Sequence, residues 1–508
     1  MKNRTSARSG GRAARIAKRT SGSAEFNPAP PGQRGGSYRP LTDSGIRAIY
    51  DTAIRLLEEL GMGECPRKLA DACLSRGAFL DERDRVRFPA SLVEDIIAEA
   101  PKKIALHGRD PNRSIEIGGE RVFFGTGGAA VRTLDMDTGL YRPSTLKDLY
   151  DFTRLQDRLE NISWFTRCCI ATDIPDIYDL DVNTAYALVR GTTKPIATSF
   201  TLAEHVAPVI RLFDMAEGGE GRFKRHPWCV AHISPIISPF RYGEDAVDVA
   251  SECIRREFPV NCITGAQSGA TGPATPASFL AASLAETLAS LLMINCIRPG
   301  YPMIFSNWPF VIDLRSGAFT GGGAETAVMN AASAQLSNWL GLPSGIASSM
   351  SDSKAVDYQM GAEKGIAALA AGLAGGNVVY ESSGMSSALL GASFEAFVLD
   401  NEMLSGVYRA IRGIEVDSDT LGYDDICSAV LGDGHFLGAG QTMRSMQRDY
   451  VYPELADRET PDIWGEKGAP EIIQAAREKA RNILSCHHPK FLRKENDRRI
   501  REEFNILL

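Results

Sequence analysis

The segment best equipped for chemistry is a polar loop that carries both a carboxylate and an amine, Met350-Ser351-Asp352-Ser353-Lys354-Ala355. Small residues at positions 344–349 precede this loop and predict a buried strand, and a helix-forming run at 356–373 follows it. In a β/α architecture, functional side chains gather where a strand gives way to a helix. We therefore expect this loop in an active site.

The ends of the other predicted strands add aromatic and acidic side chains. Ring faces attract ammonium groups and carboxylates add net attraction, so this mixture predicts a pocket for an organic cation. Each ring taken alone also fits a core position, and Glu325 also fits a first-turn carboxylate favoured by a helix dipole. The expected catalytic residues are Glu325 and Asp352, and the expected substrate-binding residues are Phe124, His232, Trp308, Phe310, Ser349, Met350, Tyr380, Glu381 and His435.

Lys354 supports a different kind of chemistry. A lysine near the end of a barrel strand can be desolvated and become a Schiff-base nucleophile, which would make the protein a lyase or aldolase. The simpler role for Lys354 is a surface lysine at a helix start. A third possibility is a protein that keeps the cation pocket and binds quaternary amines without catalysis.

Cofactor motifs are sparse. Asp433-Gly434-His435-Phe436-Leu437-Gly438 fits a D-x-H-x-x-G pattern that supplies a histidine ligand to cobalt in corrinoid-binding domains, but no Gly-Gly pair follows it, as that fold requires. Cys486-His487-His488 has no second ligand cluster near it in sequence, and no phosphate-binding glycine loop is present. We expect no bound metal and no cofactor in a domain of this chain, with His435 either facing the site or serving as an ordinary loop histidine.

Composition sets the broad class. The chain has 508 residues, 44% of them hydrophobic, and a net charge of -7, which gives no field for attracting nucleic acid. The apolar run 277–297 contains Glu286 and predicts a buried helix, not a membrane span. Ten scattered cysteines without a C-x-x-C pair predict small core residues in a reducing compartment, the cytoplasm.

The order of the predicted elements indicates the fold. Apolar strand candidates alternate with helices such as 203–217, 243–257, 276–297, 324–340 and 356–373. This alternation predicts a TIM-like (β/α)8 barrel, with an open doubly wound sheet as the alternative. The strand candidates are 163–170, 194–200, 227–233, 259–264, 302–307, 344–349, 377–382 and, more weakly, 413–417.

Four regions follow from this pattern. Residues 1–38 are expected to be a disordered basic tail, because residues 1–36 hold eight Lys or Arg and one acid, Glu25, and little apolar surface. Residues 39–160 are expected to form a mixed N-terminal α/β region and residues 161–465 the barrel. Residues 466–508 are expected to form a helical C-terminal tail.

Several segments together resemble the trimethylamine methyltransferase superfamily. The likeness runs from about residue 41 to about residue 484. The segments that carry it include G-R-D-P-N-R, F-F-G-T-G-G, E-N-I-S-W-F, P-V-N-C-I-T-G, S-D-S-K-A-V-D-Y-Q-M-G-A-E-K, L-A-G-G-N-V-V-Y, V-L-D-N-E-M and G-H-F-L-G-A-G-Q-T.

The resemblance implies a β/α barrel that moves a methyl group from a methylated amine to the Co(I) of a corrinoid held by a separate small protein. Met350 occupies the position at which the amine-demethylating members carry pyrrolysine, an electrophile thought to add the amine. Methionine cannot do this. A substrate that already bears a quaternary nitrogen would not need it, and members without pyrrolysine include glycine betaine demethylases.

We therefore expect a quaternary-amine:corrinoid methyltransferase of the EC 2.1.1 class. Its expected partners are a methylated quaternary amine, a corrinoid-binding protein and further copies of the same chain, with no nucleic acid and no membrane. A betaine would also need a partner for its carboxylate, and the candidates are Arg315, His232, Asn307, Gln267 and His435.

Overall fold

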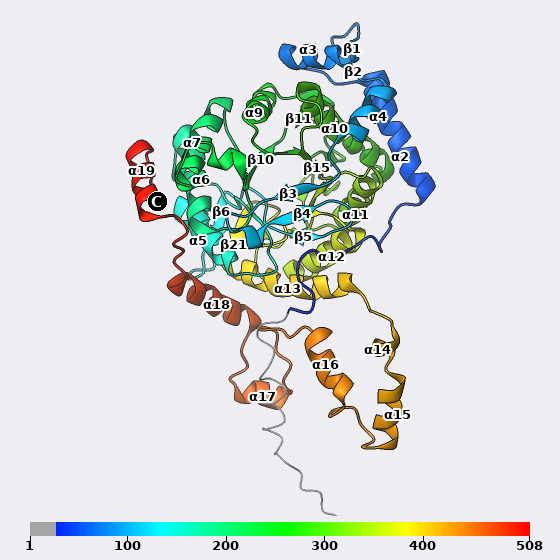
Figure 1. Ribbon diagram of the computed structural model, residues 1–508, viewed down its shortest axis with the longest axis vertical. Coiled ribbons are helices and arrows are strands. Elements are labelled where there is room, and N and C mark those ends of the chain that lie inside the picture. The colour runs from blue at the N-terminus through cyan, green and yellow to red at the C-terminus, as the bar shows by residue number, and fades with distance from the viewer. Residues whose placement is uncertain (1–26) are drawn as a thin grey trace, which may run out of the picture.

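Eight parallel strands follow one another around a barrel in the order in which they occur in the chain (Figure 1). The computed structural model describes residues 27–508. A parallel bridge between Gly125 and Trp164 joins the first strand to the second and closes the ring. The strands are β5 (Phe123–Phe124), β8 (Phe165–Thr166), β9 (Ile196–Thr198), β10 (Cys229–Ile233), β13 (Val260–Thr264), β15 (Met303–Asn307), β18 (Ser344–Ala347) and β19 (Val378–Tyr380).

Helices cover the outside of this barrel, as parallel strands require. The principal ones are α5 (Leu146–Asp157), α6 (Ile177–Gly191), α7 (Val206–Ala216), α9 (Glu244–Arg255), α10 (Pro276–Ile297), α11 (Ala324–Trp339), α12 (Tyr358–Ala374) and α13 (Phe394–Arg412). The short η3 (Ala203–His205) and α8 (Arg222–Arg225) accompany α7. The prediction of a (β/α)8 barrel is confirmed.

One predicted strand is wrong. Residues 413–417 are not a strand, because Gly413 ends α13 with a φ of 70° and Asp417 caps the next helix. The barrel is instead completed by β5, a two-residue strand inside the expected N-terminal region. Once β5 has closed the ring, no edge remains for a further strand.

The N-terminal helices pack on α10. Thr42 caps α2 (Asp43–Arg55), which continues as the π-helical turn η1 (Leu56–Leu60) and ends at Gly61. The helices α3 (Arg67–Ser75) and α4 (Ala90–Glu99) also contact α10. Helix α10 is long and apolar enough to span a membrane, but 89% of its apolar window is buried, so it is a core helix.

Residues 27–38 are ordered, contrary to the expectation of a disordered tail. Ala29 is fully buried, and the backbone N–H of Gly32 donates to the Val122 carbonyl at 2.8 Å. Gly35 lies so close to the barrel that a Cβ there would come within 2.2 Å of the Gly372 oxygen. This fit to the barrel orders the segment despite its composition, and residues 1–26 lie outside the described part of the chain.

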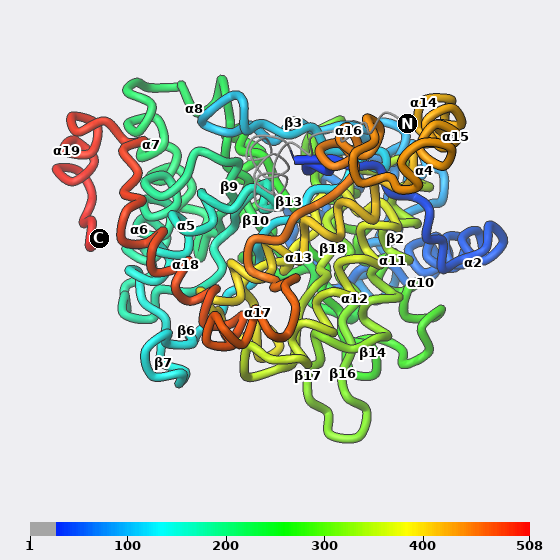
Figure 2. Tube along the Cα trace, turned by 90° about the horizontal axis from the view of Figure 1, so that it is seen from below, coloured from blue at the N-terminus to red at the C-terminus, as the bar shows by residue number. Residues whose placement is uncertain are grey.

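Small sheets surround the ends of the barrel (Figure 2). At the carboxyl ends of the barrel strands, called the mouth here, β6, β7, β20 and β21 form one sheet and β14, β16 and β17 another. Their bounds are β6 (Arg132–Leu134), β7 (Tyr141–Pro143), β14 (Gln267–Ser268), β16 (Phe310–Ile312), β17 (Phe319–Thr320), β20 (Met385–Ser386) and β21 (Gly391–Ser393). The other pairs are β1 (Phe79–Leu80) with β2 (Val86–Arg87), β3 (Ile104–Leu106) with β4 (Ile115–Ile117), near the turn η2 (Pro111–Arg113), and β11 (Ile236–Ile237) with β12 (Arg241–Tyr242).

Residues 413–452, called the outer lobe here, project from the barrel (Figure 1). The lobe contains α14 (Ser418–Leu421), α15 (Tyr423–Leu431) and α16 (Gly440–Arg448). It begins where α13 ends, and barrel helices run antiparallel to the strands, so the lobe leaves from the end opposite the mouth (Figure 2). After α17 (Pro461–Glu466), helices α18 (Ile472–Cys486) and α19 (Lys494–Glu503) pack on α13, α5 and α7.

Candidate active site at the barrel mouth

A chain of hydrogen bonds crosses the inside of the barrel near the mouth. The Ser306 hydroxyl donates to Asn261 Oδ1 at 2.6 Å, and Asn261 Nδ2 donates to Tyr380 Oη at 2.8 Å. The Tyr380 hydroxyl lies 3.2 Å from His232 Nε2, and His232 Nδ1 lies 3.2 Å from Thr166 Oγ1. These five residues, called the mouth network here, come from five different strands and fix one another's orientation.

His232 is neutral in this network. Burial lowers its pKa to about 3, and the nearby positive charge of Arg167 contributes to this shift. A neutral imidazole has one donor and one acceptor, so Nε2 accepts from Tyr380 and Nδ1–H donates to Thr166. The Thr166 hydroxyl in turn donates to the Ala197 carbonyl at 3.2 Å. His232 therefore positions Tyr380 through a hydrogen bond and does not act as a general acid.

An aromatic cluster surrounds Tyr380. Its ring centroid lies 4.2 Å from that of Trp164 and 4.9 Å from that of Trp308. The ring centroid of Phe310 lies 6.1 Å from that of Trp308 and 5.1 Å from that of Phe319, and both pairs meet edge-on. The mouth network engages the Tyr380 hydroxyl, so only the ring of this side chain is free of hydrogen bonds.

Buried polar atoms without partners concentrate at this end of the barrel. Within residues 27–508, no hydrogen bond is made by the indole nitrogens of Trp164 and Trp308, by the Thr264 hydroxyl or by either amide atom of Asn307. Thr264 and Asn307 lie side by side at the ends of β13 and β15. Buried polar groups are normally paired, so these atoms point to a place that water or a ligand fills.

The Met350 loop is tied down on both sides. Ser349 has a φ of 72°, a strained conformation for a residue other than glycine, and the Met350 side chain is fully buried. A Cβ at Gly321 would come within 2.9 Å of the Met350 Cβ, so the two backbones are in close approach. The Asp352 carboxylate accepts a hydrogen bond from the Gly321 N–H at 2.8 Å and thereby holds the loops together. Burial raises the pKa of Asp352.

Glu381 follows β19 and is fully buried. Its φ is 64°, and neither carboxyl oxygen has a hydrogen-bond partner among the described residues. Burial raises its pKa to about 8, opposed by the charge of Lys364. Lys364 itself pairs with Asp400 at 2.8 Å. Glu381 is therefore protonated at neutral pH and supplies no fixed negative charge.

A strained turn covers part of the mouth. Ser387, Ala388 and Leu389 all have positive φ values, of 50°, 51° and 74°, although none is glycine. The N–H groups of Ser387 and Ala388 donate to the carbonyls of Ser353 and Ser351 at 2.9 Å. The turn is thus anchored to the Met350 loop, which compensates for its strain.

A cavity of about 700 Å³, called the mouth cavity here, lies between these hairpins. Phe310 and Phe319 belong both to its wall and to the aromatic cluster. The charged residues that line it are Arg132 and Lys354. The remaining lining residues are Tyr141, Gly265, Gln267, Ala318, Ser387, Ala388, Leu389 and Leu390.

The structure brings together many of the residues nominated from the sequence. His232, Trp308, Phe310 and Tyr380 are linked by the contacts above. Ser349, Met350 and Asp352 share the adjoining loop, and Glu381 lies beside Tyr380 in sequence but against the glycine loop 127–128. Arg315 is paired with Asp313 at 2.9 Å, with a side chain that is 91% exposed.

Three nominated residues lie elsewhere. Phe124 packs outward, with its ring 5.1 Å from that of Tyr408 on α13. Glu325 is exposed in the first turn of α11, and His435 is exposed in the outer lobe, beyond the far end of the barrel. Phe124 faces outward because its neighbour Phe123 takes the inward position in β5. His435 lies away because residues 413–452 do not return to the mouth.

Other residues of the site were not nominated. Trp164, Thr166 and Asn261 belong to the aromatic cluster or the mouth network, and their inward alternation along predicted strands was the signal that could have found them. Arg132 and Leu389 come from hairpins whose conformation no sequence pattern indicated.

Lys354 was considered as a Schiff-base nucleophile, but it is exposed and its ammonium donates to the Asp352 carbonyl at 2.6 Å. Residues 27–508 contain no group of three or more His, Cys, Asp or Glu side chains placed to hold a metal ion.

Comparison with known proteins identifies relatives along nearly the whole chain. The family model described as trimethylamine methyltransferase (MTTB) matches residues 8–505. The glycine betaine methyltransferase of Desulfitobacterium hafniense (strain Y51) is 29% identical over 465 residues, covering 91% of this chain and 96% of the relative. The trimethylamine methyltransferase MttB of Methanosarcina thermophila is 28% identical over 455 residues, covering 89% and 93%. The monomethylamine methyltransferase structure (MtmB) from Methanosarcina barkeri aligns at 12% identity and a TM-score of 0.45, covering 90% of this chain and 96% of that one.

Proposed function

The chain belongs to the trimethylamine methyltransferase family, and from this premise we propose that it demethylates a betaine-like quaternary amine. The methyl acceptor is a corrinoid on a separate small protein, which supplies the Co(I) nucleophile. The observation that carries the proposal is the buried thioether of Met350, which packs against Gly321 in the active-site loop and offers no electrophile for activating an amine. A substrate used by this site must therefore bring its own good leaving group.

The aromatic cluster is the part of the site suited to the substrate cation. A quaternary ammonium cannot donate hydrogen bonds, so ring faces are its natural partners. Trp308, Tyr380 and Phe310 provide such faces, and the mouth network holds Tyr380 still. By removing water from the cation and orienting one N-methyl group, the site lowers the barrier for in-line attack.

No proton needs to move at the methyl group, because the leaving tertiary amine is neutral. This agrees with a neutral His232 and with an Asp352 carboxylate that is engaged with the Gly321 backbone. We assign Asp352 a positioning role, in which it holds the Met350 loop against residues 320–323. Glu325 is exposed in the first turn of α11, and we assign it no contact with the reacting atoms.

The setting of the enzyme is also a proposal. All ten cysteines lie in the described residues and none is in a disulfide, which supports a reducing compartment, the cytoplasm. The D-x-H-x-x-G segment lies exposed in the outer lobe, away from the mouth, so it supports no corrinoid site of the chain's own. We expect a corrinoid protein to approach the mouth, and we expect the enzyme to be homo-oligomeric.

The test combines the purified protein, a reduced corrinoid protein and a panel of methylated amines. Methyl transfer to Co(I) changes the corrinoid absorbance, and we expect this change with a quaternary amine and not with trimethylamine. Turnover of trimethylamine would contradict the argument from Met350. Binding of quaternary amines without turnover, in the presence of several corrinoid proteins, would favour a silent binding protein. Labelling of Lys354 by borohydride with a carbonyl substrate would favour the lyase.

A further inference from the structure

The charged lining of the mouth cavity is cationic. Arg132 and Lys354 line it, and no carboxylate does so among the residues that the structure describes. A site that bound only a simple ammonium ion would gain from acidic walls and would be weakened by two positive charges. The wall charges therefore favour a ligand that carries an anionic group.

Neither positive charge is neutralised by an ion pair within the described chain. Arg132 donates its backbone N–H to Leu390 at 3.1 Å, while its guanidinium has no hydrogen bond or ion pair there. The Lys354 ammonium donates to a carbonyl, which leaves its charge in place. The nearby Asp352 carboxylate is directed to the Gly321 N–H instead. Both cations are available to a ligand.

One structural element positions both cations. In the strained turn at 387–390, the carbonyl of Leu390 accepts a hydrogen bond from the backbone N–H of Arg132. The same turn donates from Ser387 and Ala388 to the loop that carries Lys354. This shared anchoring holds the two side chains on the wall of a single cavity.

We infer that Arg132 and Lys354 form a carboxylate subsite that selects zwitterionic quaternary amines over simple cationic ones. The inference rests on the proposed function for the ammonium end, which binds at the aromatic cluster. Phe310 joins the two parts, because it lines the cavity and contacts Trp308. The carboxylate then lies among the two cations, with a charge-assisted hydrogen bond from each.

Titration calorimetry with the full-length protein, without corrinoid, tests the subsite. The ligands are glycine betaine and choline, which share a trimethylammonium group and differ in the carboxylate. The variants are R132Q, K354M and the double variant, and the matched control is R315Q, a cation of a neighbouring hairpin that is paired with Asp313. We expect each single variant to raise the glycine betaine Kd about ten-fold or more while choline binding stays the same or tightens. R315Q should change neither.

The outcomes separate the subsite from the proposed function. Unchanged glycine betaine Kd in both single variants, or equal losses for both ligands, would overturn the subsite. A variant that left the betaine Kd unchanged and raised only the KM for a corrinoid protein would also overturn it, because the cations would then face the partner. Selective betaine binding that depends on both cations, without methyl transfer, would support the carboxylate subsite and contradict the proposed methyltransferase function. Methyl transfer from choline in preference to betaine would support the methyltransferase function and contradict the subsite.

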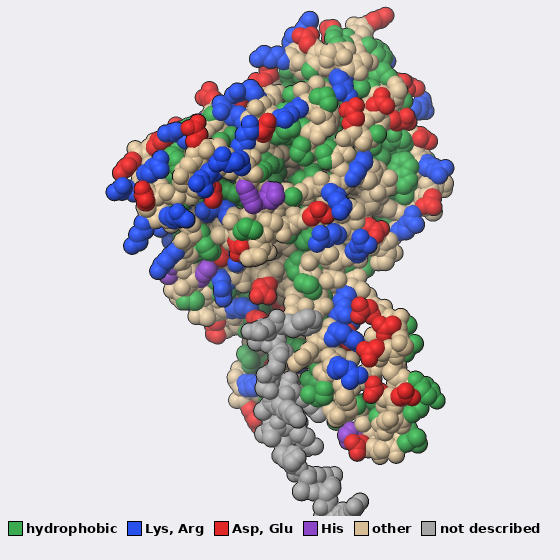
Figure 3. All heavy atoms as spheres, in the orientation of Figure 1, with side chains coloured by type: hydrophobic (Ala, Val, Ile, Leu, Met, Phe, Trp, Pro, Cys, Tyr) green, Lys and Arg blue, Asp and Glu red, His purple; other side chains and the backbone are tan. Residues whose placement is uncertain are grey.

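A second inference comes from the outer lobe, which exposes apolar side chains at its surface (Figure 3). Ile414, Val416, Tyr423 and Leu431 are between 73% and 87% exposed. On α15, Tyr423 and Val430 lie with Ile426 along one side of the helix, at the spacing of an amphipathic contact stripe. Contiguous exposed apolar surface of this kind marks an interaction site.

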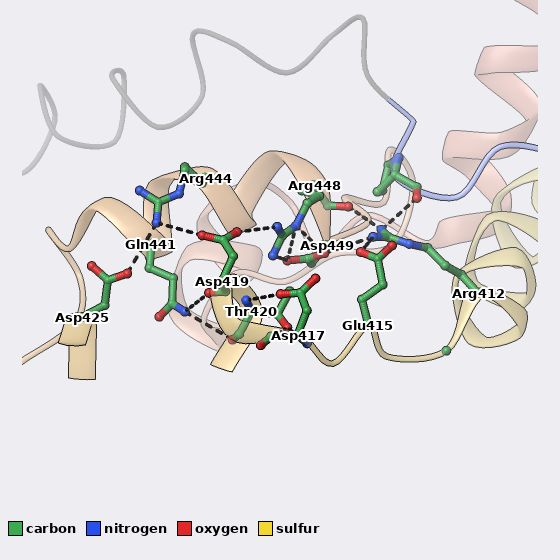
Figure 4. Close-up of polar contacts among 12 residues, drawn as sticks. Arg412, Glu415, Asp417, Asp419, Thr420, Asp425, Gln441, Arg444, Arg448 and Asp449 are labelled. Atoms are coloured by element: carbon green, nitrogen blue, oxygen red, sulfur yellow. Dashed lines mark hydrogen bonds and ion pairs between the residues drawn. The ribbon is translucent and has the colours of Figure 1, made fainter. Parts of the chain in front are cut away.

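The lobe has almost no core of its own. Across residues 413–452, the buried residues are Gly422 and Ala429. Its helices are joined mainly by ion pairs at the surface, with Asp419 3.3 Å from Arg448 and Asp425 3.4 Å from Arg444 (Figure 4). Exposed ion pairs contribute little stability. The apolar stripe therefore needs a permanent cover.

We propose that a second copy of this chain covers the stripe. Seven large hydrophobic side chains between residues 414 and 431 are exposed, and they would form the apolar centre of a specific interface, which buries ~800 Å² per partner. The lobe also has a hollow of about 380 Å³, lined in part by Met446 and Tyr452. A projecting stripe and a hollow on one lobe are what a self-complementary two-fold contact requires. A corrinoid protein must reach the mouth, at the opposite end of the barrel, and so is not the cover.

Light scattering and hydrogen exchange test this contact. We expect the wild-type protein to have a mass at least twice the 55.1 kDa protomer, and the double variant I426E/V430E to have the protomer mass. The control L140E alters a side chain that is 70% exposed in the β6–β7 turn, outside the lobe, and should keep the wild-type mass. Amide exchange of α15 in the wild-type protein should accelerate on dilution. A monomeric wild-type protein, or an unchanged mass in I426E/V430E, would refute the proposal.

Discussion

The Tyr380 hydroxyl lies 3.2 Å from Nε2 of His232, and this contact joins the last strand of the barrel to the fourth across its interior. Burial lowers the pKa of His232 to about 3, so the imidazole accepts from the phenol at every pH at which the protein would be studied. The tyrosine ring is thereby held in one orientation against Trp164 and Trp308.

Replacing Tyr380 with phenylalanine tests this contact. Y380F leaves His232 Nε2 and Asn261 Nδ2 buried without a partner, so we expect the free energy of unfolding to fall by about 1–3 kcal/mol. Denaturant unfolding measures this change. Y38F, at a half-exposed tyrosine with no hydroxyl hydrogen bond in the described structure, is the control and should unfold like the wild type. Equal stability of Y380F and wild type would show that the hydrogen bond contributes nothing.

Replacing Trp308 tests the aromatic cluster as the cation site. We expect W308A to raise the Kd of a quaternary amine about ten-fold, because a cation loses a ring face, and W308F to lose less. Calorimetry at fixed ionic strength gives both constants. W464A, which changes an indole on α17 that does not line the mouth cavity, should bind like the wild type. If W308A also binds like the wild type, the cation lies elsewhere.

Glu381 makes stability depend on pH. Its pKa in the folded protein is about 8, above the ordinary value of 4.5, so the folded state holds a proton that the unfolded state has lost. Stability should therefore fall as pH rises from about 5 to about 8, with a contribution of about 1.4 kcal/mol per pH unit from this one group. E381Q removes that contribution, and it should unfold at a higher denaturant concentration than wild type at pH 8.

Urea unfolding at several pH values measures the slope. E325Q, which alters an exposed glutamate, should keep the wild-type slope. A wild-type slope in E381Q would show that Glu381 is ionised in the folded protein throughout this range.

Gly125 has no room for a side chain. A Cβ there would lie 2.2 Å from the Trp164 ring, so G125A must displace that ring, and we expect a loss of about 1–3 kcal/mol in unfolding free energy. G361A is the matched control, since a Cβ at this helical position meets nothing within 4 Å and should stabilise α12 by about 0.5–1 kcal/mol. We therefore expect the unfolding free energy to fall in G125A and to rise in G361A. A neutral G125A would mean that Trp164 is free to move.

Much of the barrel was predictable because most of its strands have a clear sequence pattern. Seven of them are apolar runs that end in polar residues, such as the run before Asn307. The remaining one, Phe123–Phe124, is two residues long and becomes a strand through its neighbours, β19 and Trp164, which no local pattern reveals. The same shortness hid which of the two phenylalanines faces inward.

The site was predictable where it rests on strand ends and not where it rests on hairpins. His232, Trp308 and Tyr380 follow from the rule that strand ends carry function. Arg132 and Leu389 reach the mouth cavity through the turn at 387–390, whose positive φ values fall on Ser, Ala and Leu. Turn signals depend on glycine and asparagine, so such a turn is invisible in the sequence.

The bridge between Gly125 and Trp164 has a mechanical consequence. Other neighbouring barrel strands are paired over at least two residues, whereas a single backbone bridge joins the first strand to the second, supplemented by hydrogen bonds of the Thr126 hydroxyl with the Thr166 backbone. This seam is where the ring should open first when the protein breathes, and the indole that closes it also belongs to the aromatic cluster. A ligand that packs on Trp164 would then hold the seam shut, so occupancy of the site and integrity of the barrel would rise together, as slower exchange of the Ser163 amide, which donates to the Phe124 carbonyl across the seam at 2.9 Å, would report.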